Sequence, residues 1–561
     1  MDGNNKIVVR KIYKLKILTQ QQGIKMGKEE VNRRKYLQIA GATIGGVLIG
    51  AAAGWYGKPR EVLEKMVTET VERTVTKTVT TTAPPVTPTL TPTPTPTPTP
   101  ELIASWYKKA AEPYGGTTIK VLAQGWEPNY YLRDVVGPKF TDITGITIDW
   151  ELTSNELVME KEMLDMEKGT GIYACTYDDQ DMVGTWIKKG WVYDLTEFMG
   201  GHPELVDPWL DLDDIWSIPY CSDPRGHVLT IPCEYYPKTY VYRTDLFEDP
   251  TEKSNFKAKY GYDLKKPTYY DECLDAAEFF TRPDKDLYGF VGGCGAKTHE
   301  ALGFDFFESW FPTHGAQSVG LEPYGKPVLP WGINVETWGA SMARGGMLDS
   351  PQAVKAIEDF LTLGVKDAPP GVEMMIYVEA AEQVAAGRVA QTVTYTQFLS
   401  TFANPEVSKI AGKFKCDLPP VDREYWKPGM ALAYADISGY CIPLHSKHPE
   451  AAWLWMQFAV SPLNELERAK TINTTVRTSV LMDPALNAVD AKFGGVFSLL
   501  RDPEKAKLYV GTPTEIGEYA ALLYIYYTVL GKAVAGELTP EECAKELAST
   551  IDEKFHEWGY W

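Results

Sequence analysis

Two kinds of hydrophobic pattern alternate along the middle of the chain. Short apolar runs at 118–123, 145–151 and 172–177 have the length and the β-branched content of buried strands. Between them, 131–144 and 155–167 carry apolar residues at helical spacing, and a proline is expected to interrupt the first of these helices. The order strand, helix, strand, helix, strand predicts an α/β fold in which helices cover a parallel sheet.

The loops at the ends of the first and third predicted strands hold aromatic and acidic side chains. Trp126 and Glu127 follow the first strand, and Tyr177, Asp178 and Asp179 stand at the end of the third. In open parallel sheets, ligands bind in the crevice at the carboxyl ends of the strands. The sequence therefore predicts a ligand site at these loops.

A different pattern marks the N-terminal part, where residues 36–57 contain no charged side chain. The run is close to the roughly 20 residues that span a bilayer, and the basic segment 1–35 before it is expected to stay cytoplasmic. Arg33 and Arg34, followed by Lys-Tyr-Leu, resemble a twin-arginine export signal, with an ordinary Sec-dependent anchor as the alternative. Met26 is a second possible start. We expect the anchor to be retained.

The segment 58–100 joins this anchor to the rest of the chain and is rich in Val and Thr, then in Thr and Pro. Proline fixes φ and removes a backbone donor, so its second half favours an extended polyproline II path of about 3.1 Å per residue. The segment is therefore predicted to be a stalk, and residues 101–561 form the folded domain, long enough for two lobes.

Charge and cysteine spacing exclude several function classes. The net charge is −19, and residues 1–100 carry more basic than acidic side chains, so the folded domain is acidic and a nucleic-acid partner is excluded. The cysteines show no CxxC pair, and no cofactor or metal is expected. Cys221 and Cys233 are the best candidates for a disulfide. The acidic segment 207–216 lacks the spacing of a calcium loop and is interpreted as a solvated turn.

Several segments of the domain carry a family resemblance, and they occur in the family's order. They read TGITIDWELTS, LTIPCEYYPKTYVYRTDLF, DISGYCIPLHSKHPEAAWLWMQFAVSP and LTPEECAKELASTIDEKF. In this order they resemble an extracellular solute-binding protein of an ABC importer, in the sugar-binding branch that includes the maltose-binding protein.

The resemblance implies a two-lobed fold of the type II periplasmic-binding-protein class, hinged by crossing strands and closing on its ligand. Lobe 1 is expected at about 115–235 and 392–440, and lobe 2 at about 240–390 and 443–561. The implied partners are a carbohydrate and the permease subunits in the membrane. The protein is expected to be monomeric and to lie on the outer face of the cytoplasmic membrane, held by its N-terminal anchor.

The positions that match the family's ligand loops are aromatic, acidic or amide residues. They are Trp126, Glu127, Tyr177, Asp179, Tyr235, Tyr236, Asp305, Trp310, Tyr395, Gln397, Asp436 and Arg477. Aromatic rings lie against the C–H faces of sugars, and carboxylates and amides bind their hydroxyls. Any one aromatic can equally belong to the core, and Arg477 can support the hinge through a salt bridge instead of binding ligand.

Two other function classes stay open at this point. A polyamine or peptide receptor would use the same acidic and aromatic residues. A secreted glycoside hydrolase would need two carboxyl groups facing each other, and Glu127 and Glu234 are the candidates. The order of the segments favours a binding protein over an enzyme.

Overall fold

The computed structural model describes residues 99–295, 302, 309–317, 332–511 and 516–561. The description below concerns the unit Thr93–Trp561. The predicted n-region, the anchor at 36–57 with Arg33 and Arg34 before it, and nearly all of the stalk lie outside the described residues. Among the helices that are described, none has both the length and the apolar content needed to cross a bilayer.

The first sheet has five strands in the order β2-β1-β3-β10-β4. Its strands are β1 (Thr118–Gln124), β2 (Thr147–Thr153), β3 (Cys175–Asp179), β4 (Ile231–Pro232) and β10 (Ser438–Cys441). β1 pairs in parallel with β2 and β3, whereas β10 is antiparallel to β3 and β4. The predicted parallel arrangement of the first three strands is confirmed.

The helices between these strands also follow the hydrophobic pattern. They are α5 (Glu127–Tyr131), a π-helical turn (Leu132–Val136), α6 (Gly137–Thr144) and α7 (Asn155–Lys168). The predicted interruption near Pro138 is the π-helical turn, after which this proline stands in the first turn of α6. α7 ends at Gly169, whose left-handed φ of 60° is a conformation that glycine adopts without strain.

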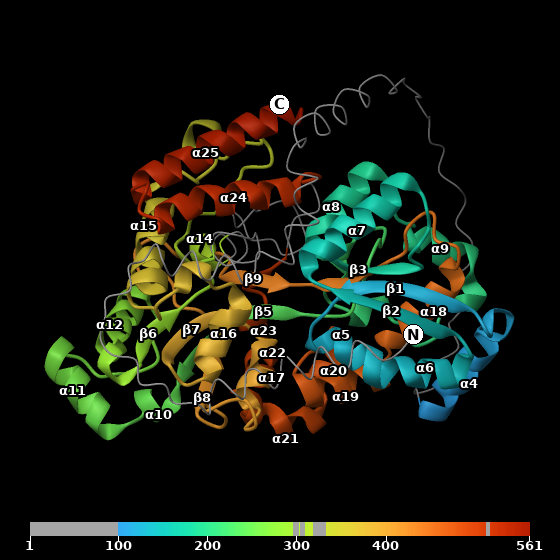
Figure 1. The fold of residues 1–561 in the computed structure, drawn as a ribbon, viewed down its shortest axis with the longest axis horizontal. Coiled ribbons are helices and arrows are strands. Elements are labelled where there is room, and N and C mark those ends of the chain that lie inside the picture. Colours follow the sequence, from blue (N-terminus) through green and yellow to red (C-terminus); the bar gives the residue numbers. More distant parts are fainter. Residues whose placement is uncertain (1–98, 296–301, 303–308, 318–331, 512–515) are drawn as a thin grey trace, which may run out of the picture. The chain divides into compact units, whose positions relative to one another are not determined.

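The second sheet has six strands, β11-β9-β5-β7-β6 with β8 beside β5. Its strands are β5 (Tyr236–Arg243), β6 (Tyr288–Val291), β7 (Val389–Tyr395), β8 (Phe414–Asp417), β9 (Ala433–Asp436) and β11 (Tyr509–Val510). Within the described residues the chain passes between the sheets three times, from β4 to β5, from β9 to β10 and from β10 to β11. β5 and β9 pair with each other where the first two passages lie. Figure 1 shows β1, β2 and β3 on one side of the molecule and β5, β6 and β7 on the other.

Helices cover both sheets. The helices placed with the first sheet are α4 (Pro100–Ala110), α8 (Gln180–Lys189), α9 (Leu195–Gly201), α18 (Pro449–Ala459) and α19 (Pro462–Ile472), in addition to those above. The others are α10 (Thr244–Phe247), α11 (Pro250–Tyr260), α12 (Tyr270–Phe280), α14 (Phe311–Thr313), α15 (Pro351–Phe360), α16 (Tyr377–Ala385), α17 (Phe398–Ala403), α20 (Thr478–Leu481), α21 (Asn487–Asp490), α22 (Val496–Arg501), α23 (Pro503–Ala506), α24 (Tyr519–Val534) and α25 (Pro540–Glu557).

Sheet membership differs from the expected lobe limits. β7, β8 and β9, between residues 389 and 436, belong to the second sheet, although 392–440 was assigned to lobe 1. α18 and α19 pack against α6 and α5, which flank the first sheet, although 443–561 was assigned to lobe 2. The chain returns to the first sheet only at β10 and then adds two helices there, so the limits of the moving lobes stay a prediction.

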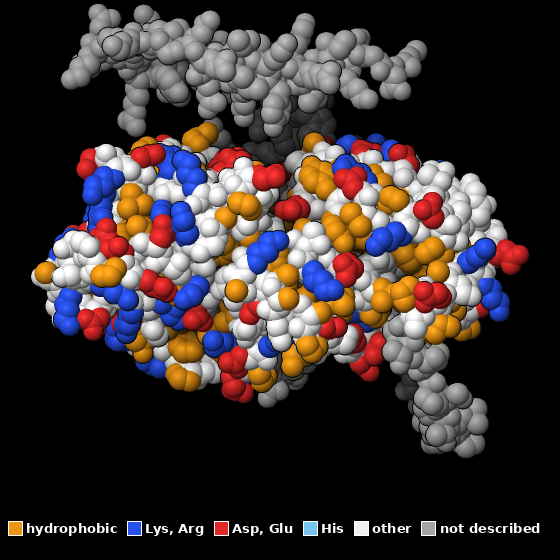
Figure 2. All heavy atoms as spheres, turned by 90° about the horizontal axis from the view of Figure 1, so that it is seen from below, with side chains coloured by type: hydrophobic (Ala, Val, Ile, Leu, Met, Phe, Trp, Pro, Cys, Tyr) orange, Lys and Arg blue, Asp and Glu red, His pale blue; other side chains and the backbone are white. Residues whose placement is uncertain are grey.

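The surface mixes charges of both signs. On the face drawn in Figure 2, basic and acidic side chains of the described residues are interspersed, with hydrophobic side chains scattered between them. Large aromatics are mainly internal, and Trp186, Trp453 and Trp455 are fully buried. Much of the aromatic content therefore serves the core.

Candidate ligand-binding site

A cavity of about 300 Å³ lies where loops of the two sheets meet. From the first sheet come the loop after β1 and Ser154 after β2, and from the second come the start of β5 and the N-terminal turns of α16 and α17. The lining residues are Gln124, Gly125, Trp126, Glu127, Pro128, Ser154, Tyr236, Tyr377, Val378, Gln397, Phe398, Ser400, Thr401 and Ile472. The predicted loop after the first strand does form one wall.

Trp126 is the central aromatic of this cavity. Its ring is edge-on to Tyr177 and Tyr236, with centroid distances of 6.4 and 5.5 Å. Its indole Nε1 is buried and has no hydrogen-bond partner among the described residues. A buried donor without a partner costs about 1–3 kcal/mol.

A narrower recess of about 20 Å³ adjoins the cavity. It is lined by Gln124, Trp126, Asn155, Asp179, Tyr377, Tyr395, Gln397, Tyr434 and Asp436. Its two acidic residues stand at strand ends near the crossing. Asp436 on β9 pairs with Tyr236 on β5, and Asp179 on β3 pairs with Ser438 on β10. The recess therefore lies where the two sheets are joined.

Burial sets the electrostatics of the recess. It raises the pKa of Asp436 to about 7, against the opposing effect of the Ser438 hydroxyl, which donates to Asp436 Oδ1 at 3.3 Å. The ammonium of Lys238 lies 4.4 Å from the centre of the Tyr395 ring. Both charge signs are thus present beside polar side chains that can bind hydroxyl groups.

Several predicted site residues line these two spaces, and others do not. Trp126, Glu127, Tyr236 and Gln397 line the cavity, and Asp179, Tyr395 and Asp436 line the recess. Asp305 lies outside the described residues. Tyr177, Tyr235, Trp310 and Arg477 line neither space.

Each of the four has another environment. The buried Tyr177 hydroxyl donates to Glu234 Oε2 at 2.7 Å, beneath the cavity wall. Tyr235 lines a separate cavity of about 440 Å³ and contacts Trp216, because adjacent residues of an extended segment point to opposite sides. Trp310 stacks on Tyr270 in the core.

Arg477 supports the fold, as the salt-bridge alternative proposed. Its side chain is 1% exposed and donates to the carbonyls of Val460 and Leu210 at 2.6 and 2.7 Å. A third bond, of 3.1 Å, reaches the carboxylate of Asp214. All of these partners are protein groups, so this guanidinium is not turned toward the cavity.

The two carboxyl groups considered for a hydrolase do not face each other in the cavity. Glu127 lies at its wall and accepts a bond of 3.1 Å from Ser400. Glu234 is fully buried, and burial raises the pKa of its carboxyl group well above the usual range. Only one of the pair therefore reaches a ligand in the cavity.

Sequence reasoning missed lining residues that depend on tertiary packing. Seven of them are Gln124, Ser154, Asn155, Tyr377, Phe398, Ser400 and Tyr434. Gln124, Ser154 and Asn155 stand at or just after the ends of β1 and β2, so the rule on strand ends could have included them. The other four had no comparable local signal.

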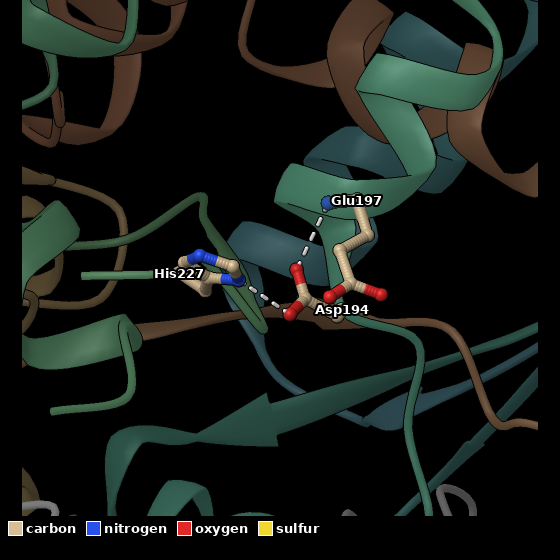
Figure 3. Close-up of side chains that lie close together, drawn as sticks. All are labelled: Asp194, Glu197 and His227. Carbon is tan, nitrogen blue, oxygen red and sulfur yellow. Dashed lines mark hydrogen bonds and ion pairs between the residues drawn. The ribbon is translucent and has the colours of Figure 1, made fainter. Parts of the chain in front are cut away.

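Acidic and histidine clusters elsewhere are explained by protein contacts. In Figure 3, Asp194 accepts from the Glu197 amide at 3.0 Å, capping α9, and from His227 Nδ1 at 2.6 Å. Arg225 adds a bond of 3.0 Å to the same carboxylate. In a second cluster, buried His314 lies 3.1 Å from Asp359, whose carboxylate also pairs with Lys355. Cations of the protein thus already neutralise both carboxylates.

Two local predictions need correction. Cys221 and Cys233 are both free thiols in the apolar core, so the suggested disulfide is absent from the described residues. The acidic segment 207–216 is not simply a solvated turn, because Asp207 is buried and accepts from the hydroxyl of Tyr107 at 2.7 Å. Asp207, expected in solvent, and the two cysteines, expected in a disulfide, are therefore all buried side chains of the fold.

The structure is a two-sheet α/β fold with a cavity at the crossing between the sheets, and solved structures share this fold. A solute-binding protein from Agrobacterium radiobacter K84 in complex with ribitol has a TM-score of 0.64 at 21% identity, covering 79% of this chain and 99% of that one. A solute-binding protein from Agrobacterium vitis S4 with bound D-mannitol has a TM-score of 0.60 at 20% identity, covering 79% of this chain and 99% of that one. Maltose-bound MalE3 of T. maritima has a TM-score of 0.62 at 17% identity, covering 78% of this chain and 100% of that one.

The family is shown by the sequence itself. The family model described as bacterial extracellular solute-binding protein matches residues 125–464. The chain therefore belongs to the family of bacterial extracellular solute-binding proteins. A search of curated proteins found no match.

Proposed function

We propose that this chain is the carbohydrate-binding component of an ABC importer, which captures a sugar or polyol at the sheet crossing and delivers it to a membrane permease. The observation that carries this proposal is the cavity itself. It combines Trp126, Tyr236, Tyr377 and Phe398 with amide and hydroxyl groups drawn from both sheets. Aromatic walls with a few polar groups suit a ring that has apolar faces and a hydroxylated edge.

The ligands bound in similar structures support the same class. Ribitol, D-mannitol and maltose occupy the structures compared above. A ligand that contacts both sheets stabilises the closed arrangement, because it adds contacts that the open arrangement lacks. Closure then signals occupancy to the permease.

Binding can be tested by thermal unfolding of the purified protein. The panel holds ribitol, D-mannitol, D-glucose, D-galactose and maltose, with spermidine and a tripeptide as probes of the alternatives. A ligand at 100 times its Kd stabilises the native state by about 2.7 kcal/mol. A shift with sugars or polyols that are recovered unchanged supports the proposal. A shift with spermidine or peptide alone contradicts the ligand class, and recovery of shortened sugar would instead indicate a hydrolase.

A matched pair of variants locates the site. Trp126→Ala removes the central aromatic of the cavity and is expected to lower sugar affinity at least about 10-fold. Trp561→Ala removes a partly exposed indole outside the cavity and is expected to leave affinity unchanged. Equal losses in the two variants would place the sugar elsewhere.

The membrane tether is a further part of this proposal. The uncharged run 36–57 would hold the protein on the outer face of the cytoplasmic membrane, and the stalk would keep a monomeric domain near its permease. Replacing Arg33 and Arg34 by lysine should block export if the twin-arginine route is used. Fractionation of cells expressing the full chain should find it with the membrane, and release of the full-length chain into the medium would contradict the tether.

A further inference from the structure

A cluster of contacts joins the first-sheet side of the protein to the second-sheet side, outside the cavity and the recess. Its residues are Thr185 and Lys188 on α8, Gly517 and Glu518 just before α24, and Tyr560 after α25. α8 packs on β3 of the first sheet, whereas α24 packs on the π-helical turn Leu361–Lys366, which packs on β6 of the second. The two helices contact each other (Figure 1), so the cluster links opposite sides of the crossing.

The contacts of this cluster meet at the Glu518 carboxylate. The ammonium of Lys188 pairs with Glu518 Oε1, and the Thr185 hydroxyl donates to the carbonyl of Gly517 at 3.0 Å. Lys188 Nζ also lies 5.4 Å from the centre of the Tyr560 ring. The Tyr560 hydroxyl donates to Glu518 Oε2 at 2.8 Å and accepts from the amide of Gly517 at 2.9 Å. Glu518 thus accepts one bond from each side of the protein.

The surroundings make this ion pair stronger than a lone pair on the surface. A lone exposed pair contributes little, because ordering two flexible side chains offsets the attraction. Here the side chain of Glu518 is 20% exposed and Tyr560 already holds its carboxylate, so pairing orders only the lysine. A Cβ at residue 517 would lie 2.5 Å from Lys188 Cδ, so the glycine at this position lets the lysine stem lie against the backbone.

The cluster lies on the same face of the crossing strands as the recess. Gln180, the first residue of α8, donates from Nε2 to the Tyr434 hydroxyl at 2.8 Å. Tyr434 and Asp436 both line the recess, and residues two apart on a strand share one face, so α8 begins on that face of β9. Lys188 stands about 12 Å further along the helix, at 1.5 Å per residue. A hinge movement that opens this face would therefore draw the last turn of α8 away from α24.

We propose that Lys188 and Glu518, held by Tyr560, form a latch that stabilises the closed arrangement, so that sugar affinity depends on an ion pair outside the sugar site. This inference rests on the proposed carbohydrate function and names a regulation of the same site. The apparent affinity of a ligand is proportional to the fraction of protein in the binding-competent arrangement, so a contact made only on closure raises it. Salt screens a partly exposed ion pair, so capture of sugar weakens as ionic strength rises.

Charge reversal tests the latch by isothermal titration calorimetry, with the sugar or polyol of the panel above that gives the largest thermal shift. Lys188→Glu places two carboxylates together and should weaken binding at least about 5-fold at about 50 mM NaCl. Combining it with Glu518→Lys restores opposite charges, so the double variant should bind more tightly than either single variant. Lys189→Glu makes the same change of charge at the next residue of α8, whose ammonium lies over the Trp191 ring, and should leave affinity unchanged.

Salt dependence separates the latch from a general loss of affinity. Raising NaCl from about 50 mM to about 500 mM should weaken sugar binding of the unmodified protein several-fold, whereas Lys188→Met, which has no ion pair to screen, should bind equally at both concentrations. Equal affinities of Lys188→Glu and Lys189→Glu, or a double variant no better than its parents, would overturn the latch and leave the carbohydrate function standing. Absence of binding of every sugar and polyol to the unmodified protein would overturn both.

Discussion

Asp178→Asn tests how burial of acidic groups next to the site makes stability depend on pH. Asp178 lies on β3, is 1% exposed and accepts a hydrogen bond from the indole of Trp186. Burial raises its pKa to about 8. Glu162 on α7 is also fully buried, and burial and the neighbouring Asp178 raise the pKa of its carboxyl group well above the usual range.

The sign and size of the effect follow from proton linkage. Unfolded Asp has a pKa of about 3.9, so between that value and about 8 the native state binds more protons than the unfolded state. The free energy of unfolding therefore falls as pH rises through this window. For Asp178 alone the loss between pH 5 and pH 8 is about 3–4 kcal/mol. Asparagine is neutral at every pH and keeps an acceptor for Trp186, so the variant should lack this part of the decline.

The assay is urea unfolding at 25 °C, followed by tryptophan fluorescence, at pH 5, 6, 7 and 8. The difference in unfolding free energy between Asp178→Asn and the unmodified protein should grow by about 3 kcal/mol from pH 5 to pH 8. Asp142→Asn, at an exposed position on α6, controls for the loss of one charge. Parallel pH curves for Asp178→Asn and the unmodified protein would refute the assignment of a proton to this buried group.

Three further substitutions probe contacts that hold the site in place. Arg477→Met removes a buried guanidinium with three protein partners and should cost about 3–5 kcal/mol of unfolding free energy, measured in urea, with sugar affinity of the folded fraction unchanged. Tyr177→Phe leaves the Glu234 carboxyl without its 2.7 Å donor and should cost about 1–3 kcal/mol in the same assay. Gly439→Ala places a Cβ 2.3 Å from a carbonyl oxygen of β4 and should lower Tm strongly, whereas Gly200→Ala, with open space around it, should not. Unchanged stability in the variant at Arg477, Tyr177 or Gly439 would contradict the contact described for that residue.

The sequence was informative where a local rule fixes the geometry. The end of β1 carries Trp126 and Glu127 into the cavity, because side chains at the carboxyl ends of parallel strands face the crevice. α7 was expected at 155–167 and is found at Asn155–Lys168, since its apolar spacing and the following glycine define both ends. Asp436 and Tyr236 were identified by family resemblance. They pair across β9 and β5, which explains why both lie at the site.

The remainder depends on packing that no local pattern encodes. Tyr235 and Tyr236 are neighbours with the same side chain, and only the direction of the strand decides which one faces the cavity. Trp310 resembles a ligand aromatic in sequence, yet its ring is 3% exposed in the core. Tyr377 and Phe398 reach the cavity because α16 and α17 begin beside it, and the relative position of two helices is a tertiary property.

One hydrogen bond joins the two sides of the cavity directly and bears on the proposed closure around a ligand. The Ser400 hydroxyl on α17 lies 3.1 Å from Glu127 Oε2 after β1 and 2.8 Å from the carbonyl of Gln397. A hydroxyl has one proton to donate, so the two acceptors share it, and the bond to Glu127 is exposed. Such a bond contributes at most about 1 kcal/mol, so Ser400→Ala should lower sugar affinity less than about 10-fold in calorimetry. The cavity walls contributed by the two sheets include Trp126 after β1 and Phe398 on α17, so a ligand that contacts both is expected to contribute more to closure than this protein contact does. A loss of more than 100-fold in Ser400→Ala would reverse that order, and closure would then depend on a contact between the two sides themselves.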